Sequence, residues 1–159
     1  MPVPCNLLVG ETFCWVNGVR AIMQFRHVLW GNWGGLGGIK NLLKILSGRR
    51  MFYGVIAGGD LIHTGWVTLS HCRFYWVEDG AAVLGPVWTD SEWRGRGIAC
   101  RALQTAINTL VHRGVTCFYI DTSGQNAAMQ NVINKCGFGA PVGVFVKGPL
   151  PPEEKNTTC

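Results

Sequence analysis

The feature that most constrains the fold is a series of short, closely spaced apolar stretches in the middle of the chain. Each stretch is rich in aromatic and β-branched residues, which favour strands. Glycine-containing turns separate the first stretch from the second and the third from the fourth. Because strands joined by such short connections pair antiparallel, this region predicts a β-meander. The stretches cover residues 51–57, 61–70, 71–77 and 81–89.

After the meander the hydrophobic period becomes helical. A helix is predicted to begin near Ala99, and a short buried strand is predicted to follow over residues 115–121. A second helix is predicted to run from Asn126 to a closing Gly137. Residues 138–147 predict a last strand. This order of elements predicts an α/β domain with a mixed sheet.

The first fifty residues are less regular. Residues 12–30 predict a strand and a turn at 17–18, then a second strand or a short helix, between which the hydrophobic period does not decide. Residues 31–38 predict a loop, because a helix or strand so rich in glycine would lose too much backbone entropy. An amphipathic helix is predicted next. Its apolar stripe consists of Ile39, Leu42, Leu43 and Leu46.

Size and charge limit the classes of protein to consider. With 159 residues, of which 48% are hydrophobic, the chain can form one domain with a full core and is short for two. Fourteen Lys and Arg against nine Asp and Glu give a net charge of +5. This charge suits an anionic ligand, whether a nucleotide, an acidic lipid or a nucleic acid, without choosing among them.

The cysteines and the N-terminus bear on the compartment. The seven cysteines are scattered without the spacing of metal ligands, so no metal site is predicted and a reducing compartment is favoured. The first residues lack the basic and long apolar segments of a signal peptide. No stretch approaches the roughly 20 apolar residues of a membrane span. We therefore expect a cytoplasmic protein without a transmembrane segment.

Residues 93–99, W-R-G-R-G-I-A, join the last strand of the meander to the next helix. Gly95 and Gly97 remove side chains that would keep a ligand off the backbone, so several N–H groups can point at one oxyanion. The N-terminal end of the helix and the charges of Arg94 and Arg96 favour the same ligand. The stretch predicts a phosphate site. A glycine-rich turn that merely starts a helix, with solvated arginines, is the alternative.

Two motifs carry a resemblance to a known family. R-G-R-G-I-A fits the R/Q-x-x-G-x-G/A signature of the GNAT superfamily of acyl-CoA-dependent N-acetyltransferases, and N-A-A-M-Q-N-V-I-N-K-C-G-F at 126–138 resembles its late segment. The resemblance implies a single GNAT-like domain over residues 1–148, with a mixed, mostly antiparallel sheet, flanking helices and strands splayed at an acyl-CoA cleft. Residues 1–50 would form the acceptor-side half, and residues 149–159 would form a mobile tail.

The resemblance also implies acetyl-CoA as co-substrate. The Gly-Arg stretch would hold its diphosphate, and main-chain groups after a bulge at residues 85–86 would meet the pantetheine. A plain bent edge strand is the alternative for the proline at this bulge. The residues expected to bind the coenzyme are Val87, Trp88, Thr89, Arg94, Gly95, Arg96, Gly97, Ile98, Ala99, Asn126 and Lys135.

Members of the family transfer the acetyl group by direct attack of an amine on the thioester, which needs a neutral amine and then a proton for the thiolate. The tyrosine that often returns this proton is replaced here by Ile133. His63, in the meander, titrates near neutrality and is the candidate base, acting directly or through water. A hydrogen-bonded histidine within the sheet is the alternative.

The predicted function is N-acetyl transfer from acetyl-CoA to a primary amine of a small acceptor. An amino sugar is the first candidate, because Trp15, Trp30 and Trp33 flank or lie in the glycine-rich loop and indoles stack on sugar faces. For any one of the three, a tryptophan of the core is the commoner alternative. One alternative is an acyl-CoA sensor or scaffold of GNAT fold without activity. A basic, aromatic-rich RNA-binding module is less favoured, so nucleic acid is not an expected partner. An open sheet edge would allow a homodimer.

Overall fold

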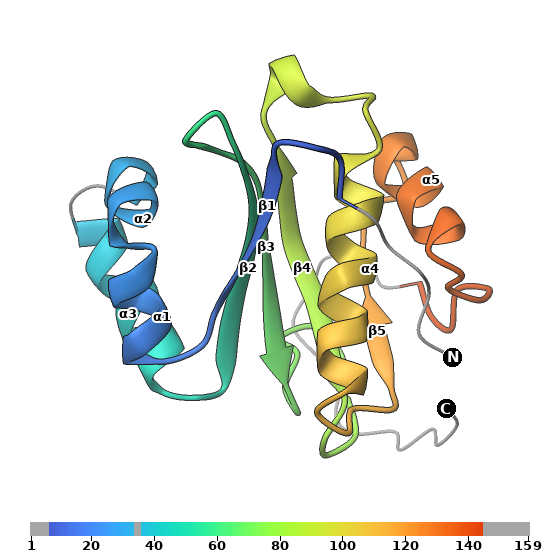
Figure 1. Cartoon of the computed structure of the whole chain (residues 1–159). Coiled ribbons are helices and arrows are strands. Elements are labelled where there is room, and N and C mark those ends of the chain that lie inside the picture. Colours follow the sequence, from blue (N-terminus) through green and yellow to red (C-terminus); the bar gives the residue numbers. More distant parts are fainter. Residues whose placement is uncertain (1–6, 34–35, 145–159) are drawn as a thin grey trace.

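One five-stranded sheet lies at the centre of the molecule, which the computed structural model describes over residues 7–33 and 36–144 (Figure 1). The strands lie side by side in chain order. The first four pair antiparallel, and the fifth runs parallel to the fourth. The predicted α/β class with a mixed, mostly antiparallel sheet is confirmed. The strands are β1 (Glu11–Val16), β2 (Arg50–Ala57), β3 (Asp60–Leu69), β4 (Ala82–Thr89) and β5 (Phe118–Ile120).

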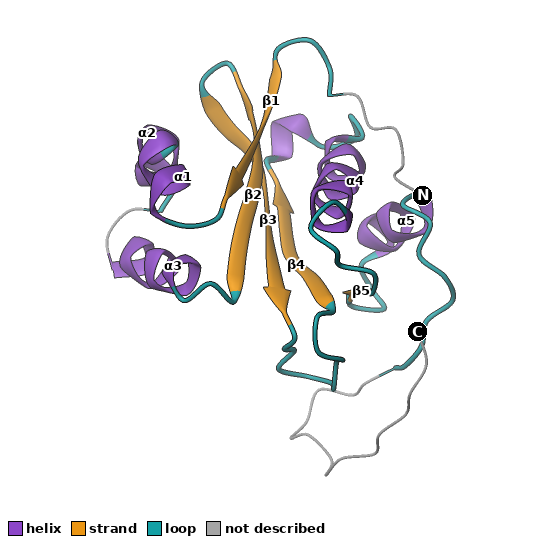
Figure 2. Cartoon of the chain, turned by 60° about the horizontal axis from the view of Figure 1, so that its bottom comes forward, coloured by secondary structure: helices purple, strands orange, loops and turns teal. Residues whose placement is uncertain are grey.

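Helices lie on both sides of this sheet, as Figures 1 and 2 show. Three short helices cover one face, and a longer helix covers the other with a fifth helix beside it. None of the helices in the described ranges is both long and apolar enough to cross a bilayer. The helices are α1 (Val19–Gln24), α2 (Arg26–Asn32), α3 (Leu36–Leu46), α4 (Ile98–Val111) and α5 (Ala127–Lys135), and the single-turn 3₁₀ helix η1 (Ser91–Trp93) precedes α4.

Strand β2 contributes to two separate cores, because successive side chains point to opposite faces of a sheet. Phe52 packs with Leu29 of α2 and Ile45 of α3 on one face. Tyr53 packs in the core beneath α4, together with Leu103. All five side chains are buried. Burial on both faces explains why this strand has a continuous apolar sequence rather than an alternating one.

Residues 71–77 do not form the predicted strand. β3 pairs directly with β4, with Leu69 opposite Ala82, so the sheet has no place for another strand between them. The intervening residues form a loop whose ends are joined by a hydrogen bond of 2.9 Å from the Ser70 N–H to the Ala81 carbonyl. The aromatic and β-branched content of this stretch was therefore a misleading signal for a strand.

The segment over residues 17–38 is more helical than predicted. The undecided stretch after the turn forms α1 and α2, and the predicted loop at 31–38 is shorter because α2 extends into it and α3 begins within it. Gly38 has a packing reason, since a Cβ at this position would overlap the main-chain carbonyl of Trp33. The close approach that glycine permits here offsets its entropic disadvantage in a helix.

The apolar stripe predicted for α3 is mostly turned to solvent. Ile39, Leu43 and Leu46 are 53%, 61% and 51% exposed, and Leu42 is half-buried. Ile45, which lies outside the predicted stripe, is 1% exposed and packs toward the sheet. The position of α3 over β2 therefore decides which of its sides is buried, and the strongest apolar period does not.

The end of the chain also differs from the prediction. Residues 138–144 form no strand. Pro141 lacks the amide that a strand ladder needs, and glycines stand two residues away on each side of it. The remainder of the predicted strand, residues 145–147, and the expected mobile tail at 149–159 lie outside the described residues.

Candidate active site

Strand β4 loses its partner on one side halfway along its length. The register with β3 shifts between Gly65 and Val67, so that residues 85–86 form a bulge opposite Trp66. On its other side, β4 pairs with β5 only over residues 82–84. Among the described residues, the stretch of β4 after the bulge therefore has no strand partner on the side of β5. This is the predicted bulge, and it lies where the two strands part.

The main-chain groups after the bulge alternate in direction. The Asp90 N–H donates to the Ile62 carbonyl of β3 at 3.0 Å. Because amides along a strand alternate between its two edges, the Trp88 N–H also turns toward β3, and the N–H groups of Val87 and Thr89 turn toward the gap beside β5. The Thr89 carbonyl faces the same way. The N–H groups of Val87 and Thr89 and the Thr89 carbonyl thus form an unpaired strand edge that faces this gap.

The loop between β4 and α4 is shaped by its two glycines. Gly95 and Gly97 have φ angles of 76° and 72°, in the left-handed region where a Cβ is strained. Gly97 is the N-cap of α4, and within the described residues the amides of 95–99 donate to no protein acceptor. These free amides lie at the positive end of a 14-residue helix, an arrangement that favours an anionic ligand. Ile98, Ala99 and the glycines thus lie together as predicted.

The two arginines of this loop are placed differently. The Arg94 Nε donates to the Thr89 carbonyl at 3.0 Å, which holds its guanidinium at the end of β4 beside the gap. The guanidinium of Arg96 lies 4.8 Å from the centroid of the Trp93 ring. Both side chains are exposed. The loop therefore presents two full positive charges beside its free amides.

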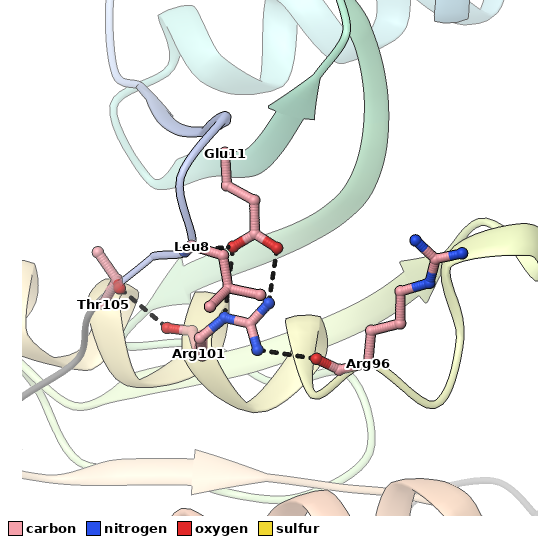
Figure 3. Close-up of polar contacts among 5 residues, drawn as sticks. All are labelled: Leu8, Glu11, Arg96, Arg101 and Thr105. Carbon is pink, nitrogen blue, oxygen red and sulfur yellow. Dashed lines mark hydrogen bonds and ion pairs between the residues drawn. The ribbon is translucent and has the colours of Figure 1, made fainter.

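A third arginine, Arg101, contacts the main chain of the loop (Figure 3). The sequence had not indicated this residue. Arg101 donates from Nη1 to the Arg96 carbonyl at 2.8 Å and from Nη2 to Glu11 Oε1 at 2.6 Å. Glu11 Oε2 also accepts the Leu8 N–H at 3.0 Å. The side chains of Arg101 and Glu11 are only 19% and 6% exposed. This network joins the start of β1 to the glycine loop.

His63, the predicted base, is fully buried in β3. Its Nδ1 lies 2.8 Å from Thr89 Oγ1, and among the described residues its Nε2 has no hydrogen-bond partner. Burial lowers the pKa of His63 to about 4, so the ring is neutral at pH 7. The arrangement is that of a hydrogen-bonded sheet histidine. Its link to the candidate site is the hydrogen bond with Thr89, whose main chain borders the gap beside β5.

Asn126 and Lys135 lie at opposite ends of α5. Asn126 Oδ1 accepts the Met129 N–H at 3.1 Å, so the side chain caps the helix. Lys135 is exposed, and the Sγ of the next residue, Cys136, lies 3.4 Å from the Sγ of Cys100 in the first turn of α4. The end of α5 that carries Lys135 thus lies beside the first turn of α4. Asn126 is roughly 13 Å away along the helix axis, so the two residues do not share one contact point.

Two of the three tryptophans expected near the acceptor serve the cores instead. Trp15 stacks on Tyr53 with centroids 6.4 Å apart, in the core beneath α4. Trp33 packs edge-on against Phe52 at 4.8 Å, in the other core. Only Trp30 of the three is largely exposed, at 70%. Packing thus accounts for Trp15 and Trp33, as expected for tryptophans of the core.

Comparisons with known proteins bear on the family and the fold of the chain. The model of the family described as Acetyltransferase (GNAT) family matches residues 37–138, which is more than half of the chain. The match includes both the glycine loop and α5. No curated protein sequence matches the chain.

Several solved structures share the fold. AAC(6')-Iy in complex with the bisubstrate analogue CoA-S-monomethyl-acetylneamine is 18% identical, with a TM-score of 0.64 over 87% of this chain and 97% of that one. An aminoglycoside acetyltransferase from an uncultured soil metagenomic sample, in complex with sisomicin, is 8% identical, with a TM-score of 0.67 over 90% and 98%. A ribosomal-protein-alanine N-acetyltransferase from Brucella melitensis biovar Abortus is 12% identical, with a TM-score of 0.60 over 86% and 96%. The chain belongs to the GNAT family of acetyltransferases.

Proposed function

We propose that this chain transfers an acetyl group from acetyl-CoA to a primary amine of a small acceptor. The observation that carries the proposal is the row of free amides over residues 95–99, which lies next to the unpaired edge of β4. The free amides suit a phosphate group, and the unpaired edge of β4 suits an extended chain. Together they suit a ligand that has a diphosphate followed by an amide-containing arm.

The loop fits the diphosphate by shape and charge. Gly95 and Gly97 leave the amides uncovered, and Ile98 and Ala99 add the first N–H groups of α4. Arg94 and Arg96 add two positive charges. Lys135 is proposed as a third, because the next residue, Cys136, contacts the first turn of α4. The binding free energy of the diphosphate would come from the amides together with these charges, because a helix terminus alone contributes only about 0.3–1 kcal/mol.

The edge of β4 fits the pantetheine arm. The N–H groups of Val87 and Thr89 face the gap, where an extended chain with amides can pair with them as an added strand does. The bond from Arg94 to the Thr89 carbonyl joins this edge to the glycine loop. Trp88 contributes through its indole, which is 48% exposed, because its amide turns toward β3. Asn126 retains its side-chain nitrogen for the coenzyme while its oxygen caps α5.

Two steps of the reaction, stabilisation of the thioester oxygen and protonation of the thiolate, need a partner group. Attack of a neutral amine places negative charge on the thioester oxygen, and we assign the Val87 N–H, directly after the bulge, as the donor to that oxygen. The departing thiolate needs a proton, which the side chain of Ile133 does not have. Solvent at the open gap therefore supplies this proton.

His63 is proposed as the base, acting through Thr89. The buried ring does not reach the amine itself, and its hydrogen bond to Thr89 Oγ1 is the link to the gap. His63→Gln and Thr89→Val should slow turnover and change the pH–rate profile in the same way. An unchanged profile in His63→Gln would reject this role.

An amino sugar remains the proposed acceptor. The structural neighbours crystallised with acetylneamine-linked CoA and with sisomicin are aminoglycoside acetyltransferases, and their likeness in fold supports an amine on a sugar. Within this chain, the exposed indole of Trp88 stands on the strand that borders the gap and can stack on a sugar face. A cytoplasmic location and a homodimer paired through a sheet edge stay predictions.

One experiment separates acetyl transfer from its main alternative. Release of free thiol from acetyl-CoA is measured with a panel of amino sugars, polyamines and peptides, beside thermal unfolding with CoA alone. Thiol release with an amino sugar would support the proposal. Stabilisation by CoA without turnover of any amine would instead favour an acyl-CoA sensor, an alternative that the replacement of the usual acid by Ile133 keeps open. Without stabilisation by CoA, both proposals fail.

A further inference from the structure

The layer of helices α1–α3 differs in charge from the rest of the molecule. Residues 12–59 contain none of the nine Asp and Glu of the chain. They do contain six of the fourteen Lys and Arg, five of which are exposed. This segment therefore has no carboxylate of its own to neutralise its positive charge. The six basic residues are Arg20, Arg26, Lys40, Lys44, Arg49 and Arg50.

The same helices, which lie at the left of Figure 1, carry several large apolar side chains that are exposed. On α3 the stripe of Ile39, Leu43 and Leu46 follows the spacing of one helix face, and Lys40 and Lys44 border it. We call the exposed side chains of α1–α3 the outer helical surface. Its apolar members are Val19 (64% exposed), Met23 (54%), Trp30 (70%), Ile39 (53%), Leu43 (61%) and Leu46 (51%).

We propose that the outer helical surface docks this protein on a bilayer of anionic phospholipid. Helices that lie in a membrane interface combine an apolar stripe, often with Trp and Leu, with bordering Lys and Arg. The apolar side chains enter the boundary between headgroups and acyl chains. The flexible stems of the basic residues lie along this boundary and bring their charges to the lipid phosphates. Because α1–α3 lie on the sheet face away from α4, the glycine loop stays accessible on a docked molecule.

Charge argues for lipid over the other occupants of such a surface. A second copy docked through the same surface would bring two sets of cations together without any carboxylate from residues 12–59 to pair with them. Protein interfaces in general are depleted of lysine, whereas two lysines border the α3 stripe here. An anionic bilayer satisfies the apolar side chains and the charges at once.

The test is sedimentation of the full chain with two kinds of vesicle. One kind contains phosphatidylcholine alone, and the other contains phosphatidylcholine with phosphatidylglycerol. We expect binding to the anionic vesicles only, and weaker binding as salt is added. In R26Q/K40Q we expect about a 30-fold loss of binding, since each basic residue near an anionic surface contributes about 1 kcal/mol. For Leu43→Gln we expect a loss on the order of tenfold, by removal of an apolar side chain.

A matched control removes the same charge elsewhere. R73Q/K135Q removes one exposed arginine and one exposed lysine, both from outside residues 12–59, and should bind as the unmodified chain does. All four substituted polar positions are exposed, so folding is retained. The proposal is overturned if the chain ignores anionic vesicles, or if both double variants lose binding equally. It is also overturned if gel filtration shows a dimer that Leu43→Gln dissociates, because the surface would then be covered by a second copy.

Discussion

The imidazole of His63 lies entirely within the protein, where burial disfavours its charged form. Its pKa is about 4 in the folded state, against an ordinary value of 6.5 in the unfolded chain. Between these two values the unfolded state binds a proton and the folded state does not. The free energy of unfolding therefore falls as the pH drops from 6.5 toward 4, and this residue accounts for a loss of about 3 kcal/mol.

Urea unfolding at a series of pH values checks this expectation. His63→Gln keeps a polar side chain at this position but cannot titrate. We expect the variant to have a shallower loss of stability on acidification than the unmodified chain. The comparison removes the contribution of the carboxylates, which titrate in both proteins. Equal pH dependence in the two proteins would show that the ring is not held neutral by burial.

Gly97 tests the phosphate site at a single residue. Gly97→Glu places a carboxylate beside the free amides, and we expect it to abolish thermal stabilisation by CoA. Any side chain here is strained, because the φ angle is 72° and a Cβ would lie 3.2 Å from Arg101 Nη1. Gly97→Gln therefore carries the same strain without the charge, and it should retain part of the CoA effect. An equal response to CoA in both variants would argue against an anion at this loop.

Among the elements, those with one clear local signal were predictable. The continuous apolar runs predicted β2, β3 and β4 to within one residue at each end, and glycines with positive φ stand where the loop before α4 and the end of α5 were expected. The uncovered amides of the glycine loop were predictable for the same reason, since they depend on the local sequence of one loop. Features that depend on tertiary packing, such as the buried side of α3, were predicted wrongly. The burial of Ile45 in place of Leu43 follows from where α3 sits on the sheet.

The support of the glycine loop by Glu11 could not be predicted for a similar reason. Glu11 and Arg101 are 90 positions apart, and no local pattern connects them. Glu11→Gln leaves the mostly buried guanidinium without its carboxylate, and we expect it to lower the free energy of unfolding by about 3 kcal/mol. Binding of CoA should also weaken, because Arg101 holds the Arg96 carbonyl at the loop.

A double-mutant cycle checks this pair. Unfolding free energies are measured for Glu11→Gln, for Arg101→Gln and for the double variant. If the two side chains stabilise the chain through each other, the double variant should be less destabilised than the sum of the single variants. Additive losses would mean that Glu11 and Arg101 act separately, and the network of Figure 3 would not stabilise the loop.

At the scale of the whole molecule, the two cores share one sheet, so neither can be lost alone. Phe52 and Tyr53 are adjacent in β2 and belong to different cores, and melting of this strand would open both. We therefore expect a single unfolding transition, with the same midpoint by circular dichroism and by tryptophan fluorescence. Separate midpoints would show that the α1–α3 layer unfolds independently of the part that holds the glycine loop.

This cooperativity determines how coenzyme binding at one loop affects the rest of the chain. A ligand that binds only the folded state raises the free energy of unfolding by about 2.7 kcal/mol at a hundredfold excess over its Kd. For a domain of this size that corresponds to about 8 °C in Tm. The loop is joined to β1 through Glu11 and to β4 through Arg94. The Tm should therefore rise equally when unfolding is followed by circular dichroism and by tryptophan fluorescence. A shift detected by only one probe would mean that coenzyme stabilises α4 and its loop without stabilising the sheet.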